Sequence, residues 1–281
     1  MRFLTTLFLW LLTTVLLAVT VPSAWAQRNI VDPTGYSAFT AAAARDPQLQ
    51  QAVAGELTTQ VTALADQEGS AVRSAAVRAM ANAYTSGEAF PGQFARANEV
   101  VHTWLFTDRI SRDADGGWVI DLAPMLSDTS FQQTLSQFKI DVPQTLTVPI
   151  TATPPAGLEP GRLRLAAWGP WVSVGAIVLT AVFALLTLAV ARSRGKTLAA
   201  LGVSALLVGA AGWAGLEVAR RYVNNALNHT SGDIRQIADA MVGHAISSLH
   251  QWLNLTLGAG GILVVFGVLV AMLGSMRRHP D

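Results

Sequence analysis

The sequence predicts an integral membrane protein: an α-helical transmembrane bundle of three or four spans with a mainly helical α+β extracytoplasmic domain. Three observations lead to this fold class. Of the 281 residues, 51% are hydrophobic and only 13% are charged, whereas a soluble domain is usually about 25% charged. Four segments have the length and apolar composition of a membrane span. A long polar stretch, residues 27–165, separates the first of these segments from the second.

Each apolar segment holds roughly the 20 residues that a helix needs to cross a bilayer. None of the four contains an Asp, Glu, Lys, Arg or His residue, which would be unusual for a buried helix of this length in a soluble protein. The segments cover residues 3–21, 171–191, 198–216 and 255–273. We therefore expect the last three to form a three-span membrane domain within residues 166–281.

The first apolar segment, at residues 1–26, is either a signal peptide or a retained anchor. Ala24-Trp25-Ala26 fits the small-x-small pattern of a signal-peptidase site, and Pro22 is expected to end the helix just before it. However, the apolar run of 19 residues is longer than the roughly 7–15 residues typical of a signal peptide. It lies within the range of a spanning helix. Length therefore favours a retained transmembrane anchor.

The orientation of the spans follows from the basic residues in the short loops, because cytoplasmic loops are enriched in Lys and Arg. The turn RSRGKT, residues 192–197, carries three basic residues and no acidic one, and the tail at 274–281 carries two arginines. Both are expected in the cytoplasm, with 27–170 and 217–254 outside. An arginine pair just after the third span opposes this assignment, but Glu217 lies beside it.

Residues 27–165 are expected to fold as the outer domain. It holds ten basic and fourteen acidic residues, so it should not bind an anionic surface. Apolar residues at helical spacing predict one helix after the Asp46-Pro47 cap, a second after Ser70 and a third between residues 94 and 104. Each of the first two predicted helices ends at a glycine, at Glu68-Gly69 and at Ser86-Gly87.

The later part of the outer domain predicts strands as well as a helix. Residues 118–122 are a short apolar strand candidate, and residues 130–140 return to helical spacing. The stretch TLTVPITATPP alternates like an edge strand, in which Pro149 removes one hydrogen-bond donor. The prolines that follow it predict a stiff linker into the membrane.

The loop between the last two spans, residues 217–254, is expected to form an extracytoplasmic helical hairpin. After Thr230-Ser231-Gly232, apolar residues recur at three-and-four spacing, which predicts a helix with an apolar face. That interaction face needs a cover from the other arm, from the outer domain or from another protein. It consists of Ile234, Ile237, Met241, Ala245, Leu249 and Trp252.

Glycines recur every seven residues in the third and fourth spans. A stripe of glycines allows two helix backbones to approach closely in a membrane. The spacing therefore predicts a helix-packing seam between these spans. Its residues are Gly202, Gly209, Gly260, Gly267 and Gly274.

Residues that could carry chemistry are few. The chain has no cysteine and five histidines, and His244 and His250 are spaced so that they do not share a helix face. We expect no metal site and no cofactor. Asp113 and Asp115 lie in RDADGG, which is more typical of a tight turn than of a calcium loop. No ionisable residue lies within the spans, which argues against proton-coupled transport and intramembrane proteolysis.

The layout combines an N-terminal apolar segment, an Ala-rich helical outer domain and three further spans, with DPQLQ, WVIDLAPML and VPITA as characteristic stretches. In this layout the chain resembles actinobacterial four-pass integral membrane proteins of unknown function with an extracytoplasmic helical domain. The resemblance covers most of the chain and rests on layout rather than on a motif. It implies location in a bacterial plasma membrane, but no activity and no site residues.

The sequence favours a non-enzymatic envelope protein that acts as a scaffold, accessory subunit or sensor through its extracytoplasmic domain. The expected partners are the lipid bilayer and another membrane or envelope protein, with a homo-oligomer as an open alternative. The net charge of +1 argues against nucleic acid as a partner. The alternative function is an envelope enzyme, or a lipid-binding protein, with a cleft in the outer domain. Its candidate catalytic residues are Glu99, His102, Asp113 and Asp115.

Overall fold

The structure, a computed structural model, divides by its internal contacts into two compact units. It describes residues 2–67, 73–106, 111–112, 118–121, 147–149, 169–229 and 231–276. The four-helix unit comprises Met1–Gln27, Gly169–Ala226 and Ala245–Asp281, and the second unit comprises Arg28–Trp168 and Leu227–His244.

In the described part of the chain, four helices are long enough and apolar enough to cross a membrane. They are α1 (Arg2–Ala26), α8 (Gly169–Val190), α9 (Arg194–Ala226) and α10 (Gly232–Met276). Helix α10 contributes its residues from Ala245 onward to the four-helix unit. The expected class, a multi-pass helical membrane protein, is confirmed by these helices.

Helix α1 does not stop at Pro22. It continues to Ala26 and is followed by a π-helix, η1 (Gln27–Val31). The expectation that Pro22 ends the helix was therefore wrong. A proline removes only one backbone hydrogen bond, and helices in membranes tolerate this because neighbouring groups satisfy the freed carbonyl.

The turn between α8 and α9 is shorter than the basic segment 192–197. Helix α8 ends at Val190 and α9 begins at Arg194, and the backbone N–H of Thr197 already donates to the carbonyl oxygen of Ser193 at 3.1 Å. Apolar composition marks the part of a helix that lies in lipid, whereas the helix itself can begin earlier with polar residues.

Helices α9 and α10 are joined by a short polar connection. Helix α9 continues past residue 216 to Ala226, the 3₁₀ turn η3 (Leu227–His229) follows, and α10 begins at Gly232. Gly232 has a φ of 67°, a left-handed conformation that glycine adopts without steric penalty. Residues 217–254 thus contain two helical arms and a turn.

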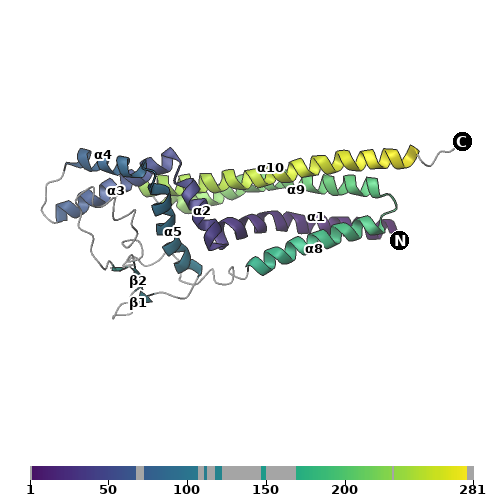
Figure 1. Cartoon of the computed structure of the whole chain (residues 1–281), viewed down its shortest axis with the longest axis horizontal. Coiled ribbons are helices and arrows are strands. Elements are labelled where there is room, and N and C mark those ends of the chain that lie inside the picture. Colours follow the sequence, from purple (N-terminus) through teal and green to yellow (C-terminus); the bar gives the residue numbers. More distant parts are fainter. Residues whose placement is uncertain are drawn as a thin grey trace. The chain divides into compact units, whose positions relative to one another are not determined.

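In the four-helix unit α1 packs along α8 and also against α9 (Figure 1). A small core forms where α1, α9 and α10 meet. Its buried residues are Val21, Val208 and Leu253, and Leu17, Leu216 and Leu249 pack around them.

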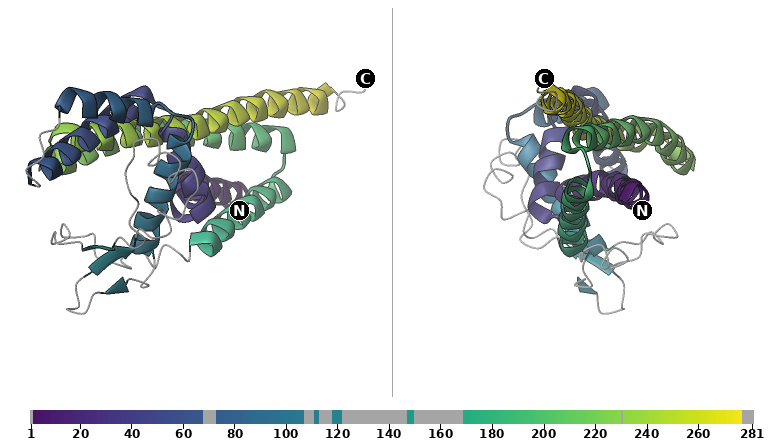
Figure 2. Two further views of the ribbon diagram at one scale, coloured as in Figure 1. Left: turned by 60° about the vertical axis from the view of Figure 1, so that its left-hand side comes forward. Right: turned by 90° about the vertical axis from the view of Figure 1, so that its right-hand side faces the viewer.

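The described part of the second unit is built mainly from helices. Its described helices pack in pairs, α3 with α4 and α2 with α5 (Figure 2). They are α2 (Pro33–Ala43), α3 (Pro47–Gln67), α4 (Ser74–Thr85) and α5 (Phe90–Phe106). The core consists of Ala43, Ala44, Leu49 and Phe90, with the early residues Ile237, Ala240 and Met241 of α10 packed against it.

The starts of these helices show which local signals operate. Helix α3 begins after Asp46, whose Oδ1 accepts the backbone N–H of Gln48 at 2.7 Å. Helix α2, which the sequence analysis did not anticipate, begins with the same Asp-Pro signal: the Oδ2 of Asp32 accepts the N–H of Gly35 at 2.7 Å. Helix α4 begins at Ser74 rather than directly after Ser70, and Ser70 itself lies outside the described residues.

Among the described residues, three short strands also belong to the second unit. They form an antiparallel sheet in the order β1-β2-β3, with Val119 opposite Ser111 on one side and Pro149 on the other. Their bounds are β1 (Ser111–Arg112), β2 (Trp118–Asp121) and β3 (Thr147–Pro149). The helix expected at 130–140 and the proline linker lie outside the described residues, and the α+β class of the whole domain stays a prediction.

Candidate functional site

The second unit has an open groove of about 800 Å³ between α2 and α5. Small side chains at helical spacing line much of it, so the two helices leave space between them. The lining residues are Pro33, Thr34, Ser37, Ala38, Ala41, Gly92, Ala95, Arg96, Glu99, His102 and Thr103.

His102 is held in place by structural contacts. Its side chain is only 5% exposed, and its Nε2 lies 2.9 Å from the carbonyl oxygen of Ile30. Because a carbonyl oxygen only accepts, Nε2 carries the hydrogen and donates it. The ring stacks on Phe106 at 4.4 Å between centroids and lies 4.8 Å from Tyr36. These contacts satisfy a buried histidine and leave little of it open to a substrate.

Glu99 and Arg96 give the groove its charged groups, and both side chains are exposed. Glu99 and His102 line the same groove, but among the described residues no hydrogen bond joins the two side chains. The paired acid and base that the sequence suggested is therefore not assembled in this structure.

Two partly buried tyrosines, Tyr36 and Tyr84, lie in the second unit. Burial raises the pKa of Tyr36, and its hydroxyl donates to the Oδ1 of Asn98 at 3.4 Å. Burial likewise raises the pKa of Tyr84 to about 12, and its ring meets Phe90 edge-on at 5.6 Å. Both phenols remain neutral at physiological pH and serve packing.

The apolar face that the sequence assigned to the hairpin is largely covered within the chain. Ile237 and Met241 pack against the core of the second unit, and Leu249 packs against the core of the four-helix unit. Ala245 and Trp252 are partly buried. Ile234 is the one member of the six that is exposed, at 52%.

Helices α9 and α10 touch through glycine backbones. A Cβ atom added at Gly202 would lie 2.7 Å from the carbonyl oxygen of Gly260, and one added at Gly260 would lie 2.9 Å from the carbonyl oxygen of Gly202. Gly267 is equally close to the backbones of Gly195 and Ala199. Only glycine leaves room for backbones to approach so closely.

The remaining glycines show the limits of the contact. Gly209 faces the side chain of Leu257, whereas a Cβ atom at Gly274 would have no described atom within 4 Å. Gly274 lies beyond the contact because α9 begins only at Arg194, opposite an earlier turn of α10. Gly195 also belongs to the contact. It lies seven residues before Gly202, but it was not predicted because it falls within the basic segment 192–197 that was expected to be a turn.

Side-chain hydrogen bonds join α1 to its neighbours in the four-helix unit. No periodic pattern predicts these bonds, since Thr and Ser are frequent in such helices. The pairs are Thr14 with Ser204 at 2.8 Å, Thr20 with Thr180 at 2.9 Å, and the Trp10 indole N–H with the Ala200 carbonyl oxygen at 2.9 Å.

Among the described residues, no group of three or more His, Asp or Glu side chains could hold a metal ion. His244 lies against Phe39 at 4.8 Å, and His250 stacks on Trp213 at 3.6 Å, so these two histidines contact aromatic rings. Asp113 and Asp115 lie outside the described residues.

No protein-family model, curated protein or solved structure matches the chain. The resemblance to actinobacterial four-pass membrane proteins therefore stays a prediction.

Proposed function

We propose that the chain is a non-enzymatic integral membrane protein of a bacterial envelope. It acts as a scaffold, accessory subunit or sensor, and its second unit lies outside the cytoplasm and binds another envelope protein. Two segments are expected in the cytoplasm, residues 192–197 and 274–281. Both are too short to hold an output domain, so any signal must pass to a partner.

The observation that carries this proposal is the groove between α2 and α5. It is open, it is lined by small residues that allow a partner's backbone to approach, and it carries both a cation and an anion, Arg96 and Glu99. Such a groove suits a segment of a protein partner, because recognition in grooves combines close packing with a few charged contacts. The apolar face of α10, for which another protein was one of three expected covers, is mostly covered within the chain, which directs the proposal to the groove.

Photo-crosslinking in native membranes tests the proposal. A photoreactive amino acid at Ala38 or at Thr103, both exposed and lining the groove, should give one discrete adduct of higher mass. The same amino acid at Thr59 or Ala76, which are exposed on α3 and α4 away from the groove lining, serves as the matched control. Equal adducts from all four positions, or none from any, would count against a partner in the groove.

The enzymatic alternative rests on Glu99 and His102 lining the same groove. A Glu99→Gln chain removes the exposed carboxylate without removing side-chain volume. If the protein is a binder, the function of this variant in cells should fall only as far as the yield of the groove adduct falls. Loss of the phenotype with the adduct retained would favour the enzyme.

A further inference from the structure

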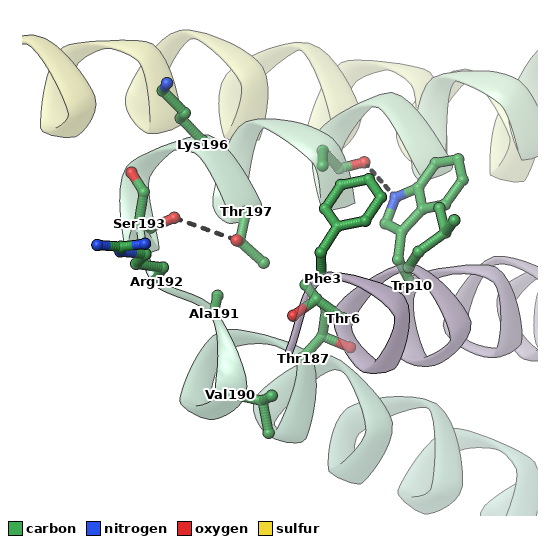
Figure 3. A pocket seen from close by; sticks show the side chains of 12 residues that line it. Phe3, Thr6, Trp10, Thr187, Val190, Ala191, Arg192, Ser193, Lys196 and Thr197 are labelled. Atoms are coloured by element: carbon green, nitrogen blue, oxygen red, sulfur yellow. Dashed lines mark hydrogen bonds between the residues drawn. The ribbon is translucent and has the colours of Figure 1, made fainter. Parts of the chain in front are cut away.

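The four-helix unit contains a second cleft, of about 770 Å³, at the end where α8 turns into α9. Its walls come from three helices: the start of α1, the end of α8 and the start of α9. Figure 3 shows Phe3, Thr6 and Trp10 on α1 facing Thr187 and Val190 on α8 and Thr197 on α9. Since all three helices are membrane-crossing candidates, their shared end lies where lipid meets water.

One end of this cleft is apolar. Phe3 is 77% exposed and Leu7 is 40% exposed, so these side chains offer uncovered hydrocarbon surface. The indole N–H of Trp10 is already used by the carbonyl oxygen of Ala200 at 2.9 Å, and Trp10 therefore presents its ring rather than a donor. A soluble ion would make no use of these walls.

The other end is cationic. Arg192, Ser193 and Lys196 line this end, apart from Phe3 and Trp10, and the side chains of Arg192 and Lys196 extend from it in different directions (Figure 3). Both cationic side chains are exposed, and in the described part of the chain neither is paired with a carboxylate. No described residue that lines the cleft is acidic, so no carboxylate among the described lining residues offsets the positive charge at this end.

We infer that this cleft binds an anionic membrane phospholipid. The phosphate would meet Arg192 and Lys196, and the upper part of an acyl chain would lie along Phe3, Leu7 and Trp10. A guanidinium matches the geometry of a phosphate with two parallel hydrogen bonds, and basic pockets between membrane helices recognise anionic headgroups. The inference does not depend on the partner proposed for the groove.

Native mass spectrometry of the full chain tests the inference. The protein is reconstituted with equal amounts of phosphatidylglycerol and phosphatidylcholine. The number of lipid molecules that stay bound is then counted as the collision energy is raised. The wild type should retain phosphatidylglycerol in preference. In the double variant Arg192→Gln, Lys196→Gln, the ratio of retained phosphatidylglycerol to retained phosphatidylcholine should fall about fivefold for each cation removed. One basic residue near an anionic surface contributes about 1 kcal/mol.

Two further variants separate the cleft from general charge. Arg220→Gln with Arg221→Gln removes two exposed cations of α9 that do not line the cleft, and should retain the wild-type preference. Ala191→Trp fills the cleft at unchanged charge and should lower phosphatidylglycerol retention. Equal retention of both lipids by the wild type, or equal losses in the two arginine-containing double variants, would overturn the inference. Displacement by millimolar inorganic phosphate alone would show a simple anion site and would also overturn it.

Discussion

A Cβ atom at Gly202 would lie within 3 Å of two backbone atoms of α10, the Gly260 carbonyl oxygen and the Val264 nitrogen, each at 2.7 Å. Backbone atoms cannot rotate away as a flexible side chain can, so any larger residue must push the two helices apart. In a bilayer the lipid tails are as apolar as the helices, and close packing is a main source of helix association. Single glycines therefore decide how tightly α9 and α10 pair.

We expect Gly202→Leu to lower the stability of the purified protein by about 1–3 kcal/mol, the usual effect of overpacking. Thermal unfolding in a mild detergent, followed by size-exclusion chromatography, measures it. Gly215→Leu is the matched control on the same helix, because a Cβ atom at Gly215 would meet no described atom within 4 Å. Equal melting temperatures for the two variants would show that α9 and α10 do not pack through Gly202.

At the scale of elements, α1 is bound to the rest of its unit by specific contacts. Its Thr14 and Thr20 hydroxyls pair with hydroxyls of Ser204 on α9 and Thr180 on α8, and its Val21 is buried with residues of α9 and α10. A cleaved signal peptide has no such role in the mature protein. The retained anchor stays a prediction, and these contacts are what the mature protein would keep with it.

We expect the mature protein to keep α1, and an intact-mass measurement on protein purified from its native membrane should show the N-terminal segment. A mature chain that starts at Gln27 would contradict this.

Thr14→Val should reduce the stability of the protein only modestly, by about 0.6 kcal/mol, because hydrogen bonds between membrane helices contribute little on average. Removal of the whole helix should lower stability far more, since it exposes the faces of α8 and α9 that α1 covers.

At the scale of the whole molecule, if all four candidate helices cross a membrane, the number of crossings determines which connections share a side. The segment between α1 and α8 and the turn between α9 and α10 would both lie on one side, and the turn between α8 and α9 on the other. In the proposed orientation the basic turn faces the cytoplasm. The chain contains no cysteine, so each side can be probed with one introduced thiol.

We expect Ser86→Cys and Ser231→Cys to react with a membrane-impermeant maleimide added to intact cells, because both positions are exposed and lie on the proposed outer side. Ser193→Cys, in the turn between α8 and α9, should react only after the membrane is permeabilised. The opposite pattern would reverse the orientation, and labelling of all three in intact cells would contradict the four-span topology.

Much of the fold could be predicted from the sequence because its signals are local. Charge-free apolar runs marked the four membrane-crossing helices, and the Asp46-Pro47 cap marked the start of α3. The same rule applied to Asp32-Pro33 would have found α2. The groove was not predictable in this way, since its walls come from α2 and α5, which are separated in the chain by α3 and α4.

By itself, the sequence determined the membrane class, the number of membrane-crossing candidates and the positions of the glycine stripes, because hydropathy and periodicity depend on neighbouring residues. Only the tertiary structure decided what each face touches. In the tertiary structure Gly195 lies in the α9–α10 contact, and His102 donates a hydrogen bond to the carbonyl of Ile30. Ile237 and Met241 pack against the core of the second unit. Such contacts join residues far apart in the chain, and their energies depend on the packed arrangement of whole helices, which no local pattern encodes.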